Sequence, residues 1–83
     1  MAKWTIRLAD DEAETFSDLC ATNGVSIQGC LLSAIRLVNE VYETQGRVPT
    51  DEWPDTAMLI PKGQLIRGAR KIDAEHRSRS KRQ

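Results

Sequence analysis

Cysteine and histidine are scarce in this chain of 83 residues, which has two cysteines and one histidine. Cys20 and Cys30 show neither the spacing of a metal site nor the pattern of a disulfide framework. Both fall at helical spacing among apolar residues, so we expect reduced, buried thiols, no metal and no cofactor. Because so short a chain buries little surface, it needs a metal, disulfides or a partner chain to be robust. A second chain is then the natural stabiliser.

Groups with catalytic chemistry are missing as well. His76 lies in a charged tail, and there is no nucleophile–base pair, metal cluster or glycine-rich phosphate loop. We therefore predict that the chain is not an enzyme. No run of residues is apolar and long enough to cross a membrane, and the N-terminus lacks the apolar core of a signal peptide. We expect a cytoplasmic protein with no membrane partner.

The formal net charge of zero hides a strong separation of charge along the chain. From Ala9 to Thr56 there are ten acidic residues against two arginines, and from Lys62 to Gln83 there are eight basic residues against two acidic ones. Lys3 and Arg7 add positive charge at the N-terminus. Each of the two basic ends is therefore able to meet a polyanion.

Residues 3–8 alternate strictly between two faces. The polar face holds Lys3, Thr5 and Arg7. The apolar face holds Trp4, Ile6 and Leu8. This period of two, in residues that favour β structure, predicts a half-buried N-terminal β-strand.

Two helices are predicted after the strand. Acidic residues at 10–12 suit the positive end of a first helix, and Asn23-Gly24 is a strong stop signal. Ser26 is a good N-cap for a second helix that ends near Gln45-Gly46. Its apolar residues cover an unusually wide surface: Ile27, Cys30, Leu31, Ala34, Ile35, Leu37, Val38, Val41 and Tyr42. A helix this apolar is buried on more than one side.

The predicted strand and the second helix both require a partner. A single strand has no partners for its backbone groups, and pairing with the same strand of a second copy about a two-fold axis would supply them. We therefore predict an intertwined homodimer with a two-stranded antiparallel intermolecular ribbon. The predicted dimer core is Trp4, Ile6, Leu8, Phe16, Leu31, Ile35 and Val38.

The polar face of this ribbon suits DNA. It would present four cations and two threonines around a symmetric centre, and a two-stranded ribbon fits a major groove about 12 Å wide. Lysine and arginine can donate to guanine there, and threonine can contact a base edge or a thymine methyl. The alternative interpretation is an ordinary solvated face.

The chain resembles the ribbon-helix-helix family of the Arc and methionine repressors in the order of its predicted elements. An alternating strand is followed by a helix, by Asn23-Gly24-Val25-Ser26 and by an apolar second helix. The resemblance covers about residues 3–47 and includes Trp4-Thr-Ile-Arg-Leu and the Gln45-Gly46-Arg47 ending. It implies a mainly α fold with one strand, and DNA binding.

The resemblance also implies which residues contact DNA. Lys3, Thr5 and Arg7 would contact bases, and Ser26, Ile27 and Gln28 would hold a phosphate through backbone amides, as a helix N-terminus can. For Ser26 the alternative, compatible with the first, is a plain N-cap. The chain departs from many relatives at Ala9, where they have proline, and beyond Arg47.

We divide the chain into a DNA-binding and dimerisation domain, residues 1–47, and a C-terminal extension, residues 48–83. The extension is predicted to be helical over about 62–73, with a disordered basic end. Three interpretations of it stay open. In the first, the extension is a basic tail with non-specific affinity for DNA. In the second, residues 57–72 bind a toxin, as in antitoxins. In the third, the extension folds back on the core, extends the dimer or joins dimers, with Trp53 and Leu59 as core residues.

The sequence thus predicts sequence-specific binding of double-stranded DNA through the ribbon, by dimers placed side by side on a palindromic or repeated operator. The cellular role would be a transcriptional repressor or a plasmid-type DNA-binding accessory. The alternatives are an antitoxin whose extension binds a toxin, and an interaction adaptor that uses the dimer as a scaffold.

Overall fold

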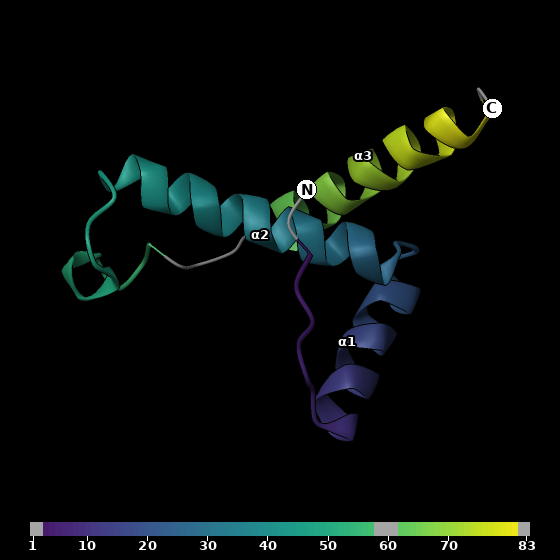
Figure 1. The fold of residues 1–83 in the computed structure, drawn as a ribbon, viewed down its shortest axis with the longest axis horizontal. Coiled ribbons are helices and arrows are strands. Elements are labelled where there is room, and N and C mark those ends of the chain that lie inside the picture. The colour runs from purple at the N-terminus through teal and green to yellow at the C-terminus, as the bar shows by residue number, and fades with distance from the viewer. Residues whose placement is uncertain (1–2, 58–61, 82–83) are drawn as a thin grey trace.

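The structure, a computed structural model, describes residues 3–57 and 62–81. They form three α-helices, α1 (Asp10–Thr22), α2 (Ile27–Thr44) and α3 (Lys62–Lys81), and a 3-10 helix, η1 (Thr50–Glu52). Helix α2 is central: α1 meets its N-terminal end, and α3 crosses it and projects past that end (Figure 1). Within the described ranges, no helix has the length and apolar character needed to cross a membrane.

Helix α1 begins and ends at the signals in the sequence. Its first turn is acidic, and the Glu12 carboxylate accepts a hydrogen bond from the Ala9 amide at 3.1 Å. At the other end Gly24 has φ 67°, a conformation that glycine adopts without steric cost. This lets the Val25 amide donate to the Cys20 carbonyl at 3.0 Å, closing the helix. The predicted stop at Asn23-Gly24 is confirmed.

Helix α2 also has the predicted ends. The Ser26 hydroxyl accepts a hydrogen bond from the Gly29 amide at 2.8 Å, as an N-cap does. The helix ends at Thr44, and Gly46 and Arg47 follow with φ 82° and 62°. These left-handed residues turn the chain so that the Arg47 amide donates to the Tyr42 carbonyl at 2.9 Å.

The core lies between α2 and α3, with the end of α1 against it. Its buried apolar residues are Cys20, Val25, Cys30, Ile66 and Ala69, with Phe16 and Leu65 packed on them. Both cysteines are free and buried, as predicted. The helices run antiparallel, since Ser33 of α2 donates to the Leu65 carbonyl at 2.8 Å while Ser26, earlier in α2, meets Asp73, later in α3.

Glycines allow α2 and α3 to approach closely. A Cβ at Gly29 would lie 2.5 Å from an Asp73 oxygen and 3.1 Å from the Ala69 carbonyl oxygen. A Cβ at Gly68 would overlap the Ser33 hydroxyl. Because real Cβ atoms do not tolerate such contacts, the packing depends on the absence of side chains at these two positions.

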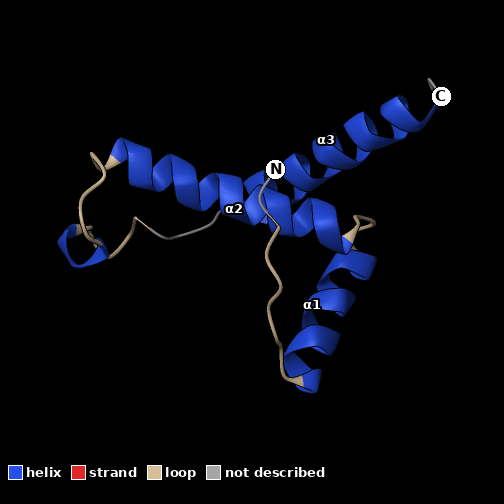
Figure 2. Ribbon diagram, in the orientation of Figure 1, coloured by secondary structure: helices blue, strands red, loops and turns tan. Residues whose placement is uncertain are grey.

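The predicted N-terminal strand is wrong. Residues 3–9 form no regular structure, and no strand occurs in the part of the chain that the structure describes (Figure 2). The predicted fold class, a ribbon-helix-helix homodimer intertwined through a two-stranded ribbon, is therefore wrong, and the described residues form a three-helix arrangement. The physical reason is that a strand exists through backbone hydrogen bonds to a neighbouring strand, and alternation of residue types does not supply one.

Helix α3 also corrects the prediction for the C-terminal extension. It begins at residue 62, as expected, but continues to Lys81 instead of ending near residue 73. The residues after Asp73 include alanine, glutamate and arginine, which have high helix propensity. A helix already held by packing over its first turns can continue through such residues, because adding a turn costs less than nucleating one.

Candidate functional site

The N-terminal segment, residues 3–9, is entirely exposed. Its apolar side chains are the least covered in the molecule's described part, with exposed fractions of 84% for Trp4, 65% for Ile6 and 52% for Leu8. The three residues predicted to contact bases, Lys3, Thr5 and Arg7, alternate with them and are exposed too. The segment thus combines free cations with apolar surface that is unfavourable in water.

A second apolar surface lies along α2. We call it the apolar stripe: Ile27, Leu31, Ile35, Val38 and Tyr42, which share one face of the helix at intervals of three or four residues. Val38 is half-buried and the other four are exposed. Within one chain, α3 covers the opposite side of α2. Trp53 packs against Tyr42 at one end of the stripe, and Ile27, Leu31 and Ile35 stay exposed.

The predicted dimer-core residues are therefore divided in this structure. Phe16 packs against the core of the single chain. Leu31 and Ile35 lie on the apolar stripe, with exposed fractions of 39% and 44%. The structure does not bring the N-terminal apolar residues and the stripe together into one buried cluster.

The N-terminus of α2 carries an anion from the chain itself. One oxygen of the Asp73 carboxylate accepts a hydrogen bond from the Ser26 amide at 2.8 Å, and the other accepts one from the Ser26 hydroxyl at 2.5 Å. These two bonds, with lesser electrostatic help from Arg77 and His76, lower the pKa of Asp73 below its usual value. The three residues predicted to hold a phosphate, Ser26, Ile27 and Gln28, are all exposed, and Ser26 contacts Asp73.

A groove adjoins this contact. It has a volume of about 450 Å³ and lies between the first turns of α2 and the second half of α3. Arg36 lines it from α2, and Asp73, Glu75 and His76 line it from α3. The groove therefore places one arginine and one histidine beside two carboxylates, of which Ser26 binds that of Asp73.

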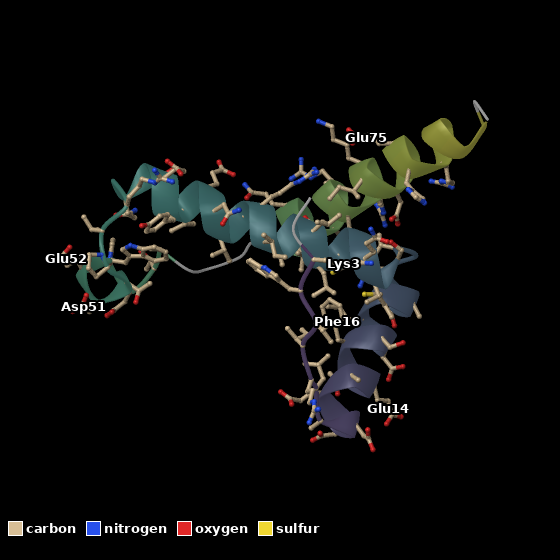
Figure 3. The ribbon with its side chains drawn as sticks, in the orientation of Figure 1. Lys3, Glu14, Phe16, Asp51, Glu52 and Glu75 are labelled. Carbon is tan, nitrogen blue, oxygen red and sulfur yellow. The ribbon has the colours of Figure 1, made fainter. Side chains whose placement is uncertain are left out.

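Positive charge gathers on α3. Arg67, Arg70, Lys71 and Arg77 are exposed, and the Arg70 guanidinium approaches the Asn23 carbonyl at 3.5 Å. Acidic side chains are more widely spread: Figure 3 shows Glu14 on α1, Asp51 and Glu52 beyond the far end of α2, and Glu75 on α3 itself. The separation of charge along the sequence is therefore only partly a separation in space.

The pKa of the buried Cys20 thiol indicates a packing role rather than a reactive one. Burial raises the pKa of Cys20, and the neighbouring Cys30 thiol raises it further. A raised pKa disfavours the thiolate, which is the reactive form. Across residues 3–57 and 62–81, no group of three or more histidine, cysteine and acidic residues is placed to hold a metal ion.

The segment predicted as a possible toxin-binding region, residues 57–72, is partly outside the described residues, which omit 58–61 and so Leu59. Within α3, its residues Ile66 and Ala69 are buried, so this apolar side already packs on α2. Trp53 is half-buried and packs against Tyr42 with ring centroids 6.3 Å apart and the ring planes tilted by 46°, and its indole N–H donates to the Val48 carbonyl at 3.2 Å.

Sequence reasoning missed the residues that join α2 to α3, namely Gly29, Ser33, Gly68 and Asp73. One signal was present: glycine inside a helix costs about 0.5–1 kcal/mol relative to alanine, so an interior glycine indicates close packing. Nothing in the sequence pairs Asp73 with Ser26, because the two residues are 47 positions apart.

No protein-family model, no curated protein and no solved structure matches this chain. The resemblance to the ribbon-helix-helix family stays a prediction from the sequence.

Proposed function

We propose that this chain is a homodimeric protein that binds double-stranded DNA and acts as a transcriptional repressor or a plasmid-type DNA-binding accessory. The observation that carries the proposal is the exposed N-terminal segment, in which Lys3 and Arg7 alternate with Trp4, Ile6 and Leu8. If a second copy covers these apolar side chains, Lys3, Thr5 and Arg7 remain free to contact DNA. The dimer then carries two copies of this set of residues.

The surface area of the chain supports the dimer. The single chain exposes 7217 Å² and has a mass of 9.3 kDa, whereas a compact monomer of that mass exposes about 5,000 Å². Part of the difference belongs to the projecting end of α3 (Figure 1). The difference is about 2,200 Å² per chain. For two chains it is about 4,400 Å², which lies within the roughly 2,000–5,000 Å² that obligate dimers bury over both chains.

The radius of gyration of the chain, like its surface area, is larger than that of a compact monomer. Its radius of gyration is 14.7 Å, and a compact domain of this length has about 12 Å. The apolar stripe of α2 provides the face for association, since a helix with apolar residues on two sides is stable when both are covered. One side is covered by α3, and we assign the other to the second copy.

The charge distribution supports DNA as the ligand. Cations lie in the N-terminal segment and on α3, where basic residues outnumber Asp73 and Glu75, whereas α1 carries five acidic residues and no basic one. A polyanion is attracted to the first set and repelled by the second, which orients its approach. Phosphate contacts by lysine and arginine supply affinity, and base contacts supply the preference for sequence.

The dimer is tested by sedimentation equilibrium of Ile35→Glu, with Ser17→Glu as the matched control. Both variants introduce one carboxylate at an exposed position, but only residue 35 lies on the apolar stripe. We expect Ile35→Glu to be monomeric and Ser17→Glu to be dimeric like the parent chain. Equal mass for both variants contradicts the assignment of the stripe.

DNA recognition is tested by selecting duplexes from a random library and comparing the wild type with Arg7→Ala. The control is Arg47→Ala, which removes an exposed arginine that pairs with Glu43 at 3.2 Å. We expect the wild type and Arg47→Ala to select the same sequences. Loss of one good base contact by Arg7→Ala should reduce discrimination by about 1–3 kcal/mol. Failure to enrich any sequence refutes the function, and an unchanged preference in Arg7→Ala refutes the role of the segment.

A further inference from the structure

A hollow lies where the first half of α3 passes the turn between α1 and α2. Its volume is about 270 Å³, and it is lined by Asn23 of the turn and by Gly63, Ile66, Arg67 and Arg70 of α3. Because positions 67 and 70 are three residues apart, both arginines lie on the same side of the helix. The hollow therefore has two guanidinium groups on its wall.

Main-chain carbonyls hold both guanidinium groups in place. The Arg67 Nε donates to the Gly63 carbonyl at 3.3 Å, and the Arg70 guanidinium approaches the Asn23 carbonyl at 3.5 Å. An arginine has five N–H donors in a rigid fork, so neither contact by itself occupies the fork. The two groups are fixed at the edge of the hollow with donors left over for a ligand.

The positive charge of the hollow is not balanced by acidic side chains in the described part of the chain. No carboxylate is among the lining residues, and neither arginine forms an ion pair with a described acidic residue. Glu40 of α2 lines a neighbouring hollow together with Arg67, but the two side chains form no ion pair. The groove beside Ser26 differs, because two carboxylates lie there with the arginine and the histidine. Like charges three residues apart on a helix repel each other, and an anion between the two arginines would remove that repulsion.

A phosphate group matches these donors. The planar fork of arginine donates two parallel hydrogen bonds to phosphate oxygens, and such charge-assisted bonds are stronger than neutral ones. The hollow has room for the group, since its volume is several times the roughly 30 Å³ that a water molecule occupies in the liquid. Ile66 and Ala69, each next to one of the arginines in the sequence, are buried in the core. The helix that carries the arginines is therefore fixed against α2.

We propose that Arg67 and Arg70 together hold one phosphate group of the DNA backbone in this hollow. The DNA as its source rests on the proposed function, whereas the phosphate chemistry rests on the hollow alone. The site gives α3 a defined role in that function. It fixes the position of the duplex backbone relative to the protein and reads no sequence, as is general for phosphate contacts.

The first test titrates inorganic phosphate and follows the protein by NMR, with Lys71→Gln as the matched control. Arg67→Gln, Arg70→Gln and Lys71→Gln each remove one exposed positive charge from α3, but Lys71 does not line the hollow. At constant pH and ionic strength, the Asn23 and Gly63 amides should shift saturably in the wild type and in Lys71→Gln, with a Kd on the order of 1 mM. In both arginine variants the Kd should be at least about tenfold higher.

The wild type gives a readout that needs no variant. In mildly acidic buffer, the Nε–H resonances of Arg67 and Arg70 should shift with the same Kd as the Asn23 and Gly63 amides, because both guanidinium groups bind one ligand. Amide shifts that are equal in the wild type and the arginine variants overturn the proposal. Nε–H resonances that do not move with phosphate also overturn it, even if an arginine variant does not fold.

The second test measures the affinity of the full-length proteins for a short duplex of mixed sequence by fluorescence anisotropy. We expect Arg67→Gln and Arg70→Gln to bind at least about fivefold more weakly than Lys71→Gln, a difference of about 1 kcal/mol. Because the two arginines share one phosphate, the double variant should bind no more than about twofold more weakly than either single variant. Independent arginines on a diffuse basic surface would instead multiply their effects, and that result overturns the shared site.

The two tests separate the phosphate site from the DNA-binding function. If phosphate binds as expected and no protein binds the duplex, the phosphate site stands and its assignment to DNA fails together with the proposed function. If the wild type binds the duplex and both arginine variants bind it as tightly as Lys71→Gln, the DNA-binding function stands and the role of the hollow is overturned.

Discussion

Replacing Gly68 with alanine tests the close contact between α2 and α3. The new Cβ would overlap the Ser33 hydroxyl and lie 3.3 Å from the Ser33 Cβ. Ser33 cannot turn away freely, because it is buried and donates to the Leu65 carbonyl at 2.8 Å. Either that hydrogen bond is lost or the helices move apart.

The size of the effect follows from two opposing contributions. Overpacking a tight contact costs about 1–3 kcal/mol, and alanine is about 0.5–1 kcal/mol better than glycine inside a helix. We expect Gly68→Ala to lower the free energy of unfolding by about 1–2 kcal/mol, the difference between these contributions. The assay is urea denaturation followed by circular dichroism at one fixed protein concentration, because association makes stability depend on concentration.

Two further variants make the result specific. Gly63→Ala lies on the same helix, and its Cβ would meet only the end of Arg67 at 3.5 Å, an ordinary contact. It should be as stable as the wild type or slightly more stable. In a Ser33→Ala background the overlapping hydroxyl is gone, so Gly68→Ala should cost less there. The reasoning is refuted if Gly68→Ala is as stable as Gly63→Ala.

Three shorter predictions follow. Because the folded pKa of Asp73 is lowered, its contribution to stability is present above the unfolded value of about 3.9 and is lost as pH falls through the folded value. An acid titration should therefore cost the wild type more stability below about pH 4 than it costs Asp73→Asn; identical curves contradict this. The buried Cys20 thiol should react with a thiol reagent only when the chain opens, so the rate should rise with urea, and a fast rate without urea contradicts its burial. Gly24→Ala should cost about 1 kcal/mol in urea denaturation, because φ is 67° there; an unchanged midpoint contradicts the left-handed turn.

The ends of α1 and α2 were predictable because they depend on a few neighbouring residues. A glycine after Asn23 can adopt the left-handed turn that closes a helix, and a serine at residue 26 can cap the next one. These are local events, decided within one helical turn. The burial of Cys20 and Cys30 was likewise predictable from their spacing among apolar residues.

The N-terminal segment shows where such reasoning stops. The alternation at residues 3–8 indicates which side chains would share a face if this segment were a strand. Whether it is a strand depends on a second strand that accepts and donates its backbone hydrogen bonds, and the alternation does not provide one. The same holds for the site. That Ser26 caps α2 is local, whereas its contact with Asp73 depends on how α3 lies across α2. Packing between segments far apart in sequence set this geometry, through Gly29, Ser33 and Gly68.

The small residues between α2 and α3 also affect the entropy of docking. Glycine and alanine have no side-chain rotamers to lose, and fixing a long side chain such as lysine or methionine costs up to about 2 kcal/mol. The contact of Gly68 and Ala69 with α2 therefore forms with little loss of side-chain freedom. It also fixes the register of the two helices, because a shift of one turn would replace these close contacts with bulkier ones. A helix docked in a single register delivers its remaining side chains, Asp73 among them, to one place on α2.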